Sequence, residues 1–72
     1  MTNTFKVKDN KGNIVFEHEN GGTANTWAMT HTNANNDYYV YYNNGINVLH
    51  FYYGDVNNIW GTTKEVMMEW VR

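Results

Sequence analysis

The chain has 72 residues, of which 17% are charged and 17% are aromatic, and its formal net charge is −2. This length allows one domain with a single thin core and no second domain. The three Trp, six Tyr and three Phe are too many for a disordered tail, and five scattered cations argue against binding nucleic acid mainly through its phosphates. Since there is no cysteine, disulfides, thiolate catalysis and cysteine-bound zinc are excluded.

The first twelve residues contain no apolar leader segment, and no stretch of the chain is apolar over the length of a membrane span. We therefore expect a cytoplasmic protein that has no membrane partner.

The chain matches itself when it is displaced by 33 places, which predicts an internal duplication of residues 5–33 and 38–66 within the single domain 1–72. The identical pairs are Val7 and Val40, Asn10 and Asn43, Gly12 and Gly45, Val15 and Val48, Gly21 and Gly54, Asn25 and Asn58, Trp27 and Trp60, and Thr30 and Thr63. Most of them fall at turn glycines, apolar strand positions and a tryptophan, where a fold constrains residue type. The other reading is that two ordinary hairpins match by chance.

Each copy begins with a predicted hairpin. Apolar residues alternate with polar ones in residues 4–8 and 14–18, and a turn ending at Gly12 separates the two segments. In the second copy, residues 38–42 and 46–53 flank Asn44-Gly45, a dipeptide typical of tight hairpin turns. We therefore expect four strands.

Apolar residues in the segment 54–71 recur at helical spacing, so we expect a C-terminal helix. They are Val56, Ile59, Trp60, Val66, Met67, Trp70 and Val71. Asp55 would cap this helix, and Gly61 would cost it about 1 kcal/mol relative to alanine. Alternatively the helix begins at Thr62, which would form a capping box with Glu65.

The corresponding segment of the first copy, residues 23–32, fits a short helix and a strand almost equally well, and the repeat favours the helix. The predicted fold is α+β, with the order ββαββα. It consists of a four-stranded antiparallel sheet made from the two repeated hairpins, with the C-terminal helix packed on one face. The alternative is a five-stranded antiparallel sheet plus the C-terminal helix.

Strand alternation predicts which sheet face is the core. In the first copy it buries Phe5, Val7, Ile14 and Phe16 and exposes Lys6, Lys8 and Glu17. In the second copy the same alternation buries Tyr38, Val40, Leu49 and Phe51. The opposite face then carries Tyr39, Tyr41, Val48, His50 and Tyr52, so positions that are charged in the first copy become aromatic in the second.

No group of residues predicts catalysis. The chain lacks serine, and His18, His31 and His50 do not have the spacing of a helical metal site. We therefore expect a protein that is not an enzyme and has no catalytic, cofactor-binding or metal-binding residues. The three tryptophans, Trp27, Trp60 and Trp70, are predicted core anchors, because so thin a domain needs its largest residues inside.

The predicted partner-binding residues are Tyr39, Tyr41, His50 and Tyr52, since contiguous exposed aromatic surface on a small protein usually marks a contact site. We expect a small interaction protein that binds a protein partner, as an accessory or inhibitor protein of a phage or mobile element does. In other readings the same face is covered within the chain or forms a homodimer. The alternative functions are a single-stranded nucleic-acid-binding module, which the low positive charge disfavours, and a carbohydrate-binding module.

Overall fold

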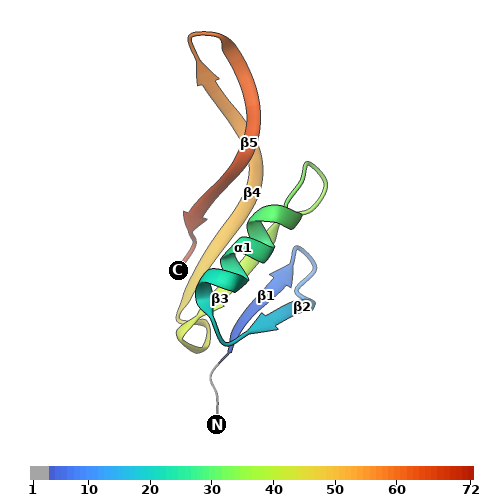
Figure 1. Ribbon diagram of the computed structural model, residues 1–72, viewed down its shortest axis with the longest axis vertical. Coiled ribbons are helices and arrows are strands. Elements are labelled where there is room, and N and C mark those ends of the chain that lie inside the picture. The colour runs from blue at the N-terminus through green and yellow to red at the C-terminus, as the bar shows by residue number, and fades with distance from the viewer. Residues whose placement is uncertain (1–3) are drawn as a thin grey trace.

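The computed structural model describes residues 4–72 and shows a five-stranded antiparallel sheet with one helix on one face (Figure 1). The strands lie side by side in the order β2-β1-β3-β4-β5. In chain order the elements are β1 (Phe5–Asp9), β2 (Ile14–His18), α1 (Gly21–His31), β3 (Tyr38–Tyr42), a 3-10 turn η1 (Asn43–Gly45), β4 (Asn47–Asn58) and β5 (Gly61–Trp70). Neighbouring strands in the sheet are consecutive in the chain except for β1 and β3, which pair although β2 and α1 lie between them in the sequence.

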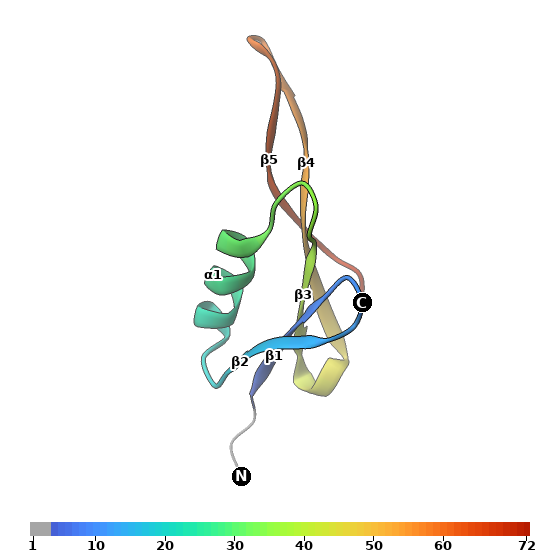
Figure 2. The same ribbon diagram turned by 90° about the vertical axis from the view of Figure 1, so that its right-hand side faces the viewer.

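The helix α1 confirms the helical reading of the segment 23–32. It begins after Asn20, whose side-chain Oδ1 accepts a hydrogen bond from the backbone N–H of Thr23 at 3.1 Å. Ala24 and Ala28 are fully buried, because their small side chains let the helix approach the sheet closely. The helix ends at His31, and the hydroxyl of the C-cap residue Thr32 donates to the carbonyl of Ala28 at 2.6 Å. Figure 2 shows α1 lying on one side of the sheet only.

The core lies between α1 and the three strands β1, β3 and β4. Val7 and Val40 are directly opposite each other in the β1–β3 ladder and both are fully buried. Leu49 and Phe51 of β4 complete the layer with the two helix alanines. The predicted burial of these four sheet residues is therefore confirmed, while Phe5, Phe16 and Tyr38 pack against them as partly buried residues.

The predicted C-terminal helix over residues 54–71 is wrong, because this segment forms the end of β4, a tight turn and β5. The β4–β5 ladder contains ten residue pairs, from Leu49 opposite Trp70 to Asn58 opposite Gly61. Gly61 adopts a φ of 118°, a value that favours glycine, so it closes the turn instead of weakening a helix. Asp55 is not a helix cap but pairs across the ladder with Lys64 at 2.6 Å.

The fold is thus α+β, as predicted, with five antiparallel strands and one helix. These element counts match the five-stranded alternative, although the helix is the middle segment and not the C-terminal one. The predicted order ββαββα is wrong because the third element of the second copy is a strand. Trp27 and Trp60, which the predicted duplication equates, accordingly lie in a helix and in a hairpin turn, and the duplication itself stays a prediction.

The prediction for Ile14 is also wrong. A bulge in β2 places Phe16 opposite Val7 but Ile14 opposite Lys8, so one extra residue, Val15, is inserted between the pairs. The insertion moves Ile14 to the face away from α1, where it is 48% exposed. Glu17 still lies opposite Lys6, as the predicted alternation requires.

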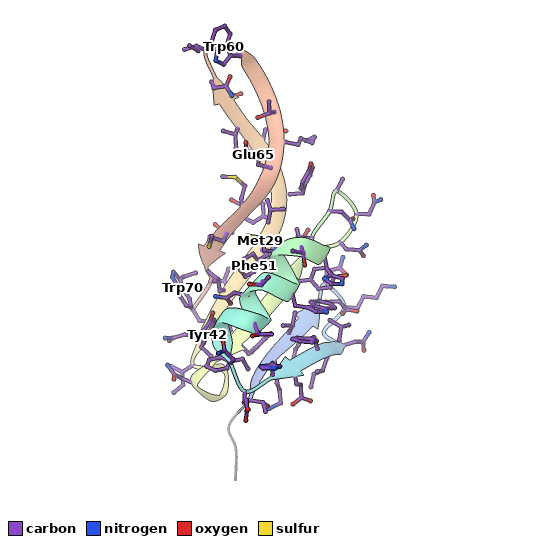
Figure 3. The ribbon with its side chains drawn as sticks, viewed as in Figure 1. Met29, Tyr42, Phe51, Trp60, Glu65 and Trp70 are labelled. Atoms are coloured by element: carbon purple, nitrogen blue, oxygen red, sulfur yellow. The ribbon has the colours of Figure 1, made fainter. Side chains whose placement is uncertain are left out.

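The end of the β4–β5 hairpin projects well beyond the helix, and we call residues 54–65 the distal arm (Figure 1). The molecule measures 49 Å along this direction and 19 Å along each of the other two. Trp60 lies at the far end of the arm and is 89% exposed, and Trp70 is 59% exposed (Figure 3). Of the three predicted tryptophan anchors, only Trp27 packs against the core. Within residues 4–72, α1 is too short and too polar to cross a membrane.

Candidate functional site

The structure places all four predicted partner-binding residues on the sheet face opposite α1. We call this set, Tyr39, Tyr41, His50 and Tyr52, the aromatic ridge. Each of the four alternates with a core residue of β3 or β4, and the alternation turns its ring to the open face. All four are partly exposed, while Val48 beside them is buried. The predicted face is therefore neither fully buried nor fully solvated.

Three rings of the aromatic ridge form a continuous stack. Tyr39 lies directly opposite His50 in the β3–β4 ladder, and their ring centroids are 4.3 Å apart with planes 6° from parallel. The imidazole also stacks with Tyr52, at a centroid distance of 5.1 Å and an angle of 29°. Cross-strand and same-strand spacing thus combine to hold the three rings in one orientation.

Two carboxylates flank His50 at opposite edges of its ring. Nε2 lies 3.1 Å from Oδ2 of Asp37, to which it can donate a hydrogen bond, and Nδ1 lies 3.5 Å from Oε1 of Glu69. The sequence prediction missed both partners. It assigned neither residue to this face, and Glu69 falls within the segment expected to form the C-terminal helix. The β4–β5 register, which sets His50 opposite Glu69, is the signal that would have found the second one.

The fourth ring, Tyr41, is contacted by a cation from the neighbouring strand. Nζ of Lys8 lies 4.5 Å from the centroid of the Tyr41 ring, a cation–π distance. Lys6 is the direct cross-strand neighbour of Tyr41 in the β1–β3 ladder. Together with Thr4 and Gly45, these side chains line a hollow of about 220 Å³ at the β1 side of the aromatic ridge.

The open face is therefore divided by charge. The cations Lys6 and Lys8 lie on β1 at one side of the aromatic ridge, and Glu69 lies on β5 at the other side. Asp37 adds a second carboxylate next to His50. The arrangement gives an aromatic centre between a basic margin and an acidic margin.

Each ring of the aromatic ridge already contacts a neighbouring side chain. Tyr39 and His50 cover each other, and Lys8 covers one side of Tyr41. Tyr52 lies against His50 and over Gly54, where an added Cβ would come within 3.1 Å of the Tyr52 ring. The ridge consequently offers ring edges and hydroxyl groups to a ligand more than it offers open ring faces.

A second hollow, of about 610 Å³, lies outside the aromatic ridge between α1 and β2. Phe16, Trp27 and several threonines line it, and Trp27 is stacked between Phe16 and His31 at centroid distances of 5.2 and 3.8 Å. No charged side chain lines this hollow. Within residues 4–72, no three His, Asp or Glu side chains are grouped so that they could hold a metal ion. At His50 the two carboxylates lie at opposite ring nitrogens, which keeps them apart.

No known protein family, curated protein or solved structure matches the chain.

Proposed function

We propose that the chain is a small non-enzymatic interaction protein that binds a protein partner through the aromatic ridge. The observation that carries this proposal is the ordered stack of Tyr39, His50 and Tyr52 on the sheet face that α1 leaves open. A protein of this kind acts by occupying a surface of its partner, which is how a small accessory or inhibitor protein works.

The stack supports binding because its rings are already held in place. Ordering a side chain at an interface costs about 0.5–1.5 kcal/mol when the side chain is free beforehand. Here the contacts with Asp37 and Glu69 fix the imidazole, and the imidazole in turn fixes the two tyrosine rings. Tyrosine combines a large apolar surface with a hydroxyl group, which suits the centre of a protein interface.

The same geometry favours a protein over single-stranded nucleic acid. Bases bind such modules by stacking on open aromatic faces within a basic groove. The rings of Tyr39 and Tyr52 are already stacked on His50, and Asp37 and Glu69 place negative charge beside the stack. Lys6 and Lys8 supply positive charge on one margin only. A carbohydrate module would likewise need an aromatic face that is free to lie on a sugar ring.

A capture experiment tests the proposal. The tagged protein is incubated with lysate of the organism that encodes it, with and without nuclease, beside the triple variant Tyr39→Ser/Tyr41→Ser/Tyr52→Ser. Tyr53→Ser is the matched control, because Tyr53 is also an exposed β4 tyrosine, 38% exposed, but alternates to the other face.

We expect a protein to be captured with or without nuclease by the wild type and by Tyr53→Ser, and to be lost with the triple variant. Circular dichroism of all three proteins establishes that they are folded, and Tyr52→Ser alone replaces the triple variant if that variant unfolds. Capture that disappears with nuclease, or that the ridge variant retains, would contradict the proposal.

A further inference from the structure

The two edges of the sheet are protected to very different degrees. An exposed strand edge can pair with another chain, and proteins usually prevent this with short edge strands, bulges, prolines or lysines. β2 has five residues and the bulge at Val15. β5 has ten residues and an unbroken ladder to β4, with no proline and with Lys64 as its one cation. The β5 edge is therefore open to pairing.

The distal arm has no second layer to pack against. α1 makes its main contacts with β1, β2 and β3. On the helix-side face of β5, Val66 packs against the core, while Met68 and Trp70 stay largely exposed. Large apolar side chains are exposed at both ends of the hairpin. They are Ile59 and Trp60 at the tip, and Met68, Trp70 and Val71 at the base. The accessible surface of 5045 Å² exceeds the roughly 4,700 Å² expected for a compact monomer of this mass.

We propose that β5 pairs antiparallel with β5 of a second copy of this chain, about a twofold axis at Val66. A twofold axis perpendicular to the sheet leaves the two faces of the sheet unexchanged. Even-numbered residues of β5 must therefore lie opposite even-numbered residues of the second copy, and odd-numbered residues opposite odd-numbered ones. Val66 then meets Val66 of the second copy, Met68 meets its Lys64, and Trp70 meets its Thr62. On the other face, Met67 meets Glu65 and Glu69 meets Thr63. The result is a continuous ten-stranded sheet.

Charge selects this register over its neighbours. With the axis at Val66, no charged residue of β5 lies opposite a like charge. Moving the axis to Met67 sets Glu65 opposite Glu69 twice, and moving it to Glu65 sets that residue opposite itself. Like charges that are directly opposite in a sheet are destabilising. Of these three registers, only the one centred on Val66 is free of like-charge pairs.

The same register brings the exposed ends together. In an antiparallel pair, the distal arm of one copy lies beside the body of the other. Trp60 of one copy then reaches the end of β5 that bears Trp70 and Val71 of the other. The pairing covers apolar side chains that are 47–89% exposed in the single chain. It also gives the distal arm the support that its own chain does not provide.

Cross-linking tests the position of the axis, since the chain has no cysteine and any introduced thiol is unique. Directly opposite strand residues have Cα atoms about 4.5–5.5 Å apart, within the range of a disulfide. We expect Val66→Cys to form a disulfide-linked dimer on mild oxidation. The control Val15→Cys lies on the other edge strand and should stay monomeric. Equal cross-linking of the two variants would overturn the proposal.

Sedimentation equilibrium over micromolar to millimolar concentrations tests the register. Wild type should dimerise. Met68→Lys, which faces Lys64 of the second copy, should raise the dissociation constant about a hundredfold. Met68→Glu should dimerise, and Met68→Lys/Lys64→Glu should regain the affinity lost by Met68→Lys. Ile14→Lys, which introduces the same charge on the other edge strand, β2, should dimerise with the affinity of the wild type. A wild type that is monomeric throughout, or a folded Met68→Lys that dimerises like wild type, would refute β5 pairing.

Discussion

The rings of Tyr39 and His50 lie face to face across β3 and β4, with centroids 4.3 Å apart and planes 6° from parallel. Such a contact should couple the two residues energetically. A double-mutant cycle with Tyr39→Ala and His50→Ala should give a coupling free energy of about 0.5–1.5 kcal/mol for unfolding in urea.

The control is a second double-mutant cycle with Tyr53→Ala and His50→Ala, since Tyr53 is a β4 residue on the other face of the sheet. Because Tyr53 and His50 do not stack, their coupling energy should be near zero. If both cycles gave the same value, the Tyr39–His50 stack would contribute nothing specific to the folded state.

The tryptophans should differ in their effect on stability. Trp27→Ala should lower the free energy of unfolding by about 2–3 kcal/mol, because the ring is stacked between Phe16 and His31 against the core. Trp60→Ala should change it by about 0.5 kcal/mol or less, since the side chain is almost fully exposed. Urea denaturation at low protein concentration measures both without any contribution from self-association. A large effect of Trp60→Ala there would mean that the arm tip packs on its own chain.

Tyr42 should make stability depend on alkaline pH. Burial raises the pKa of this phenol above its usual value of 10.0, although its hydrogen bond to Asn25 acts in the opposite direction. The folded chain therefore holds the phenol proton more tightly than the unfolded chain does. The stability from this group is fully present below pH 10 and is lost as the pH rises through the folded-state pKa. Urea denaturation between neutral and alkaline pH should show this loss, and Tyr42→Phe should remove that part of it.

Asp9 should make stability depend on pH at the acidic end of the range. Its Oδ1 accepts hydrogen bonds from the backbone N–H groups of Asn13 and Lys11, both at 2.9 Å. These bonds, the one from Asn13 foremost, lower the pKa of the carboxyl below 3.8 despite some opposing desolvation. Stability from this turn is thus present above pH 3.8 and is lost as the pH falls through the lower folded-state value. A carboxyl carbon NMR titration should find a pKa below 3.8, and an ordinary value would show that the turn is not closed in solution.

Much of the fold could be predicted from the sequence because β1, β3 and β4 each bury the residues of one face. Val40, Leu49 and Phe51 alternate with the rings of the aromatic ridge, and this alternation predicted which side chains face the core and which face away from it. The predicted burial of Ile14 was wrong because a one-residue bulge shifts the alternation, and the residue types of β2 do not indicate this bulge.

The C-terminal hairpin could not be predicted in this way because it has no single buried face. Val56, Val66 and Met67 of this hairpin are only partly buried, so the apolar pattern of period two is weak, and the same residues also fit a period of 3.6. The glycine at position 61 was the better signal. It would have cost a helix stability, whereas a tight turn requires its positive φ.

The order of strands also has a consequence for how the sheet opens. β1–β2 and β3–β4–β5 are each made from strands that are consecutive in the chain. Within the sheet, the two pieces are joined by the four residue pairs between β1 and β3. α1 contacts both β1 and β3 and so spans this seam. Separating the two pieces breaks contacts between residues far apart in sequence and leaves the hairpin pairing within each piece intact. Partial unfolding should therefore begin at this seam. Amide hydrogens bonded across β1 and β3 should then exchange together with those of α1, and faster than those bonded between β3 and β4.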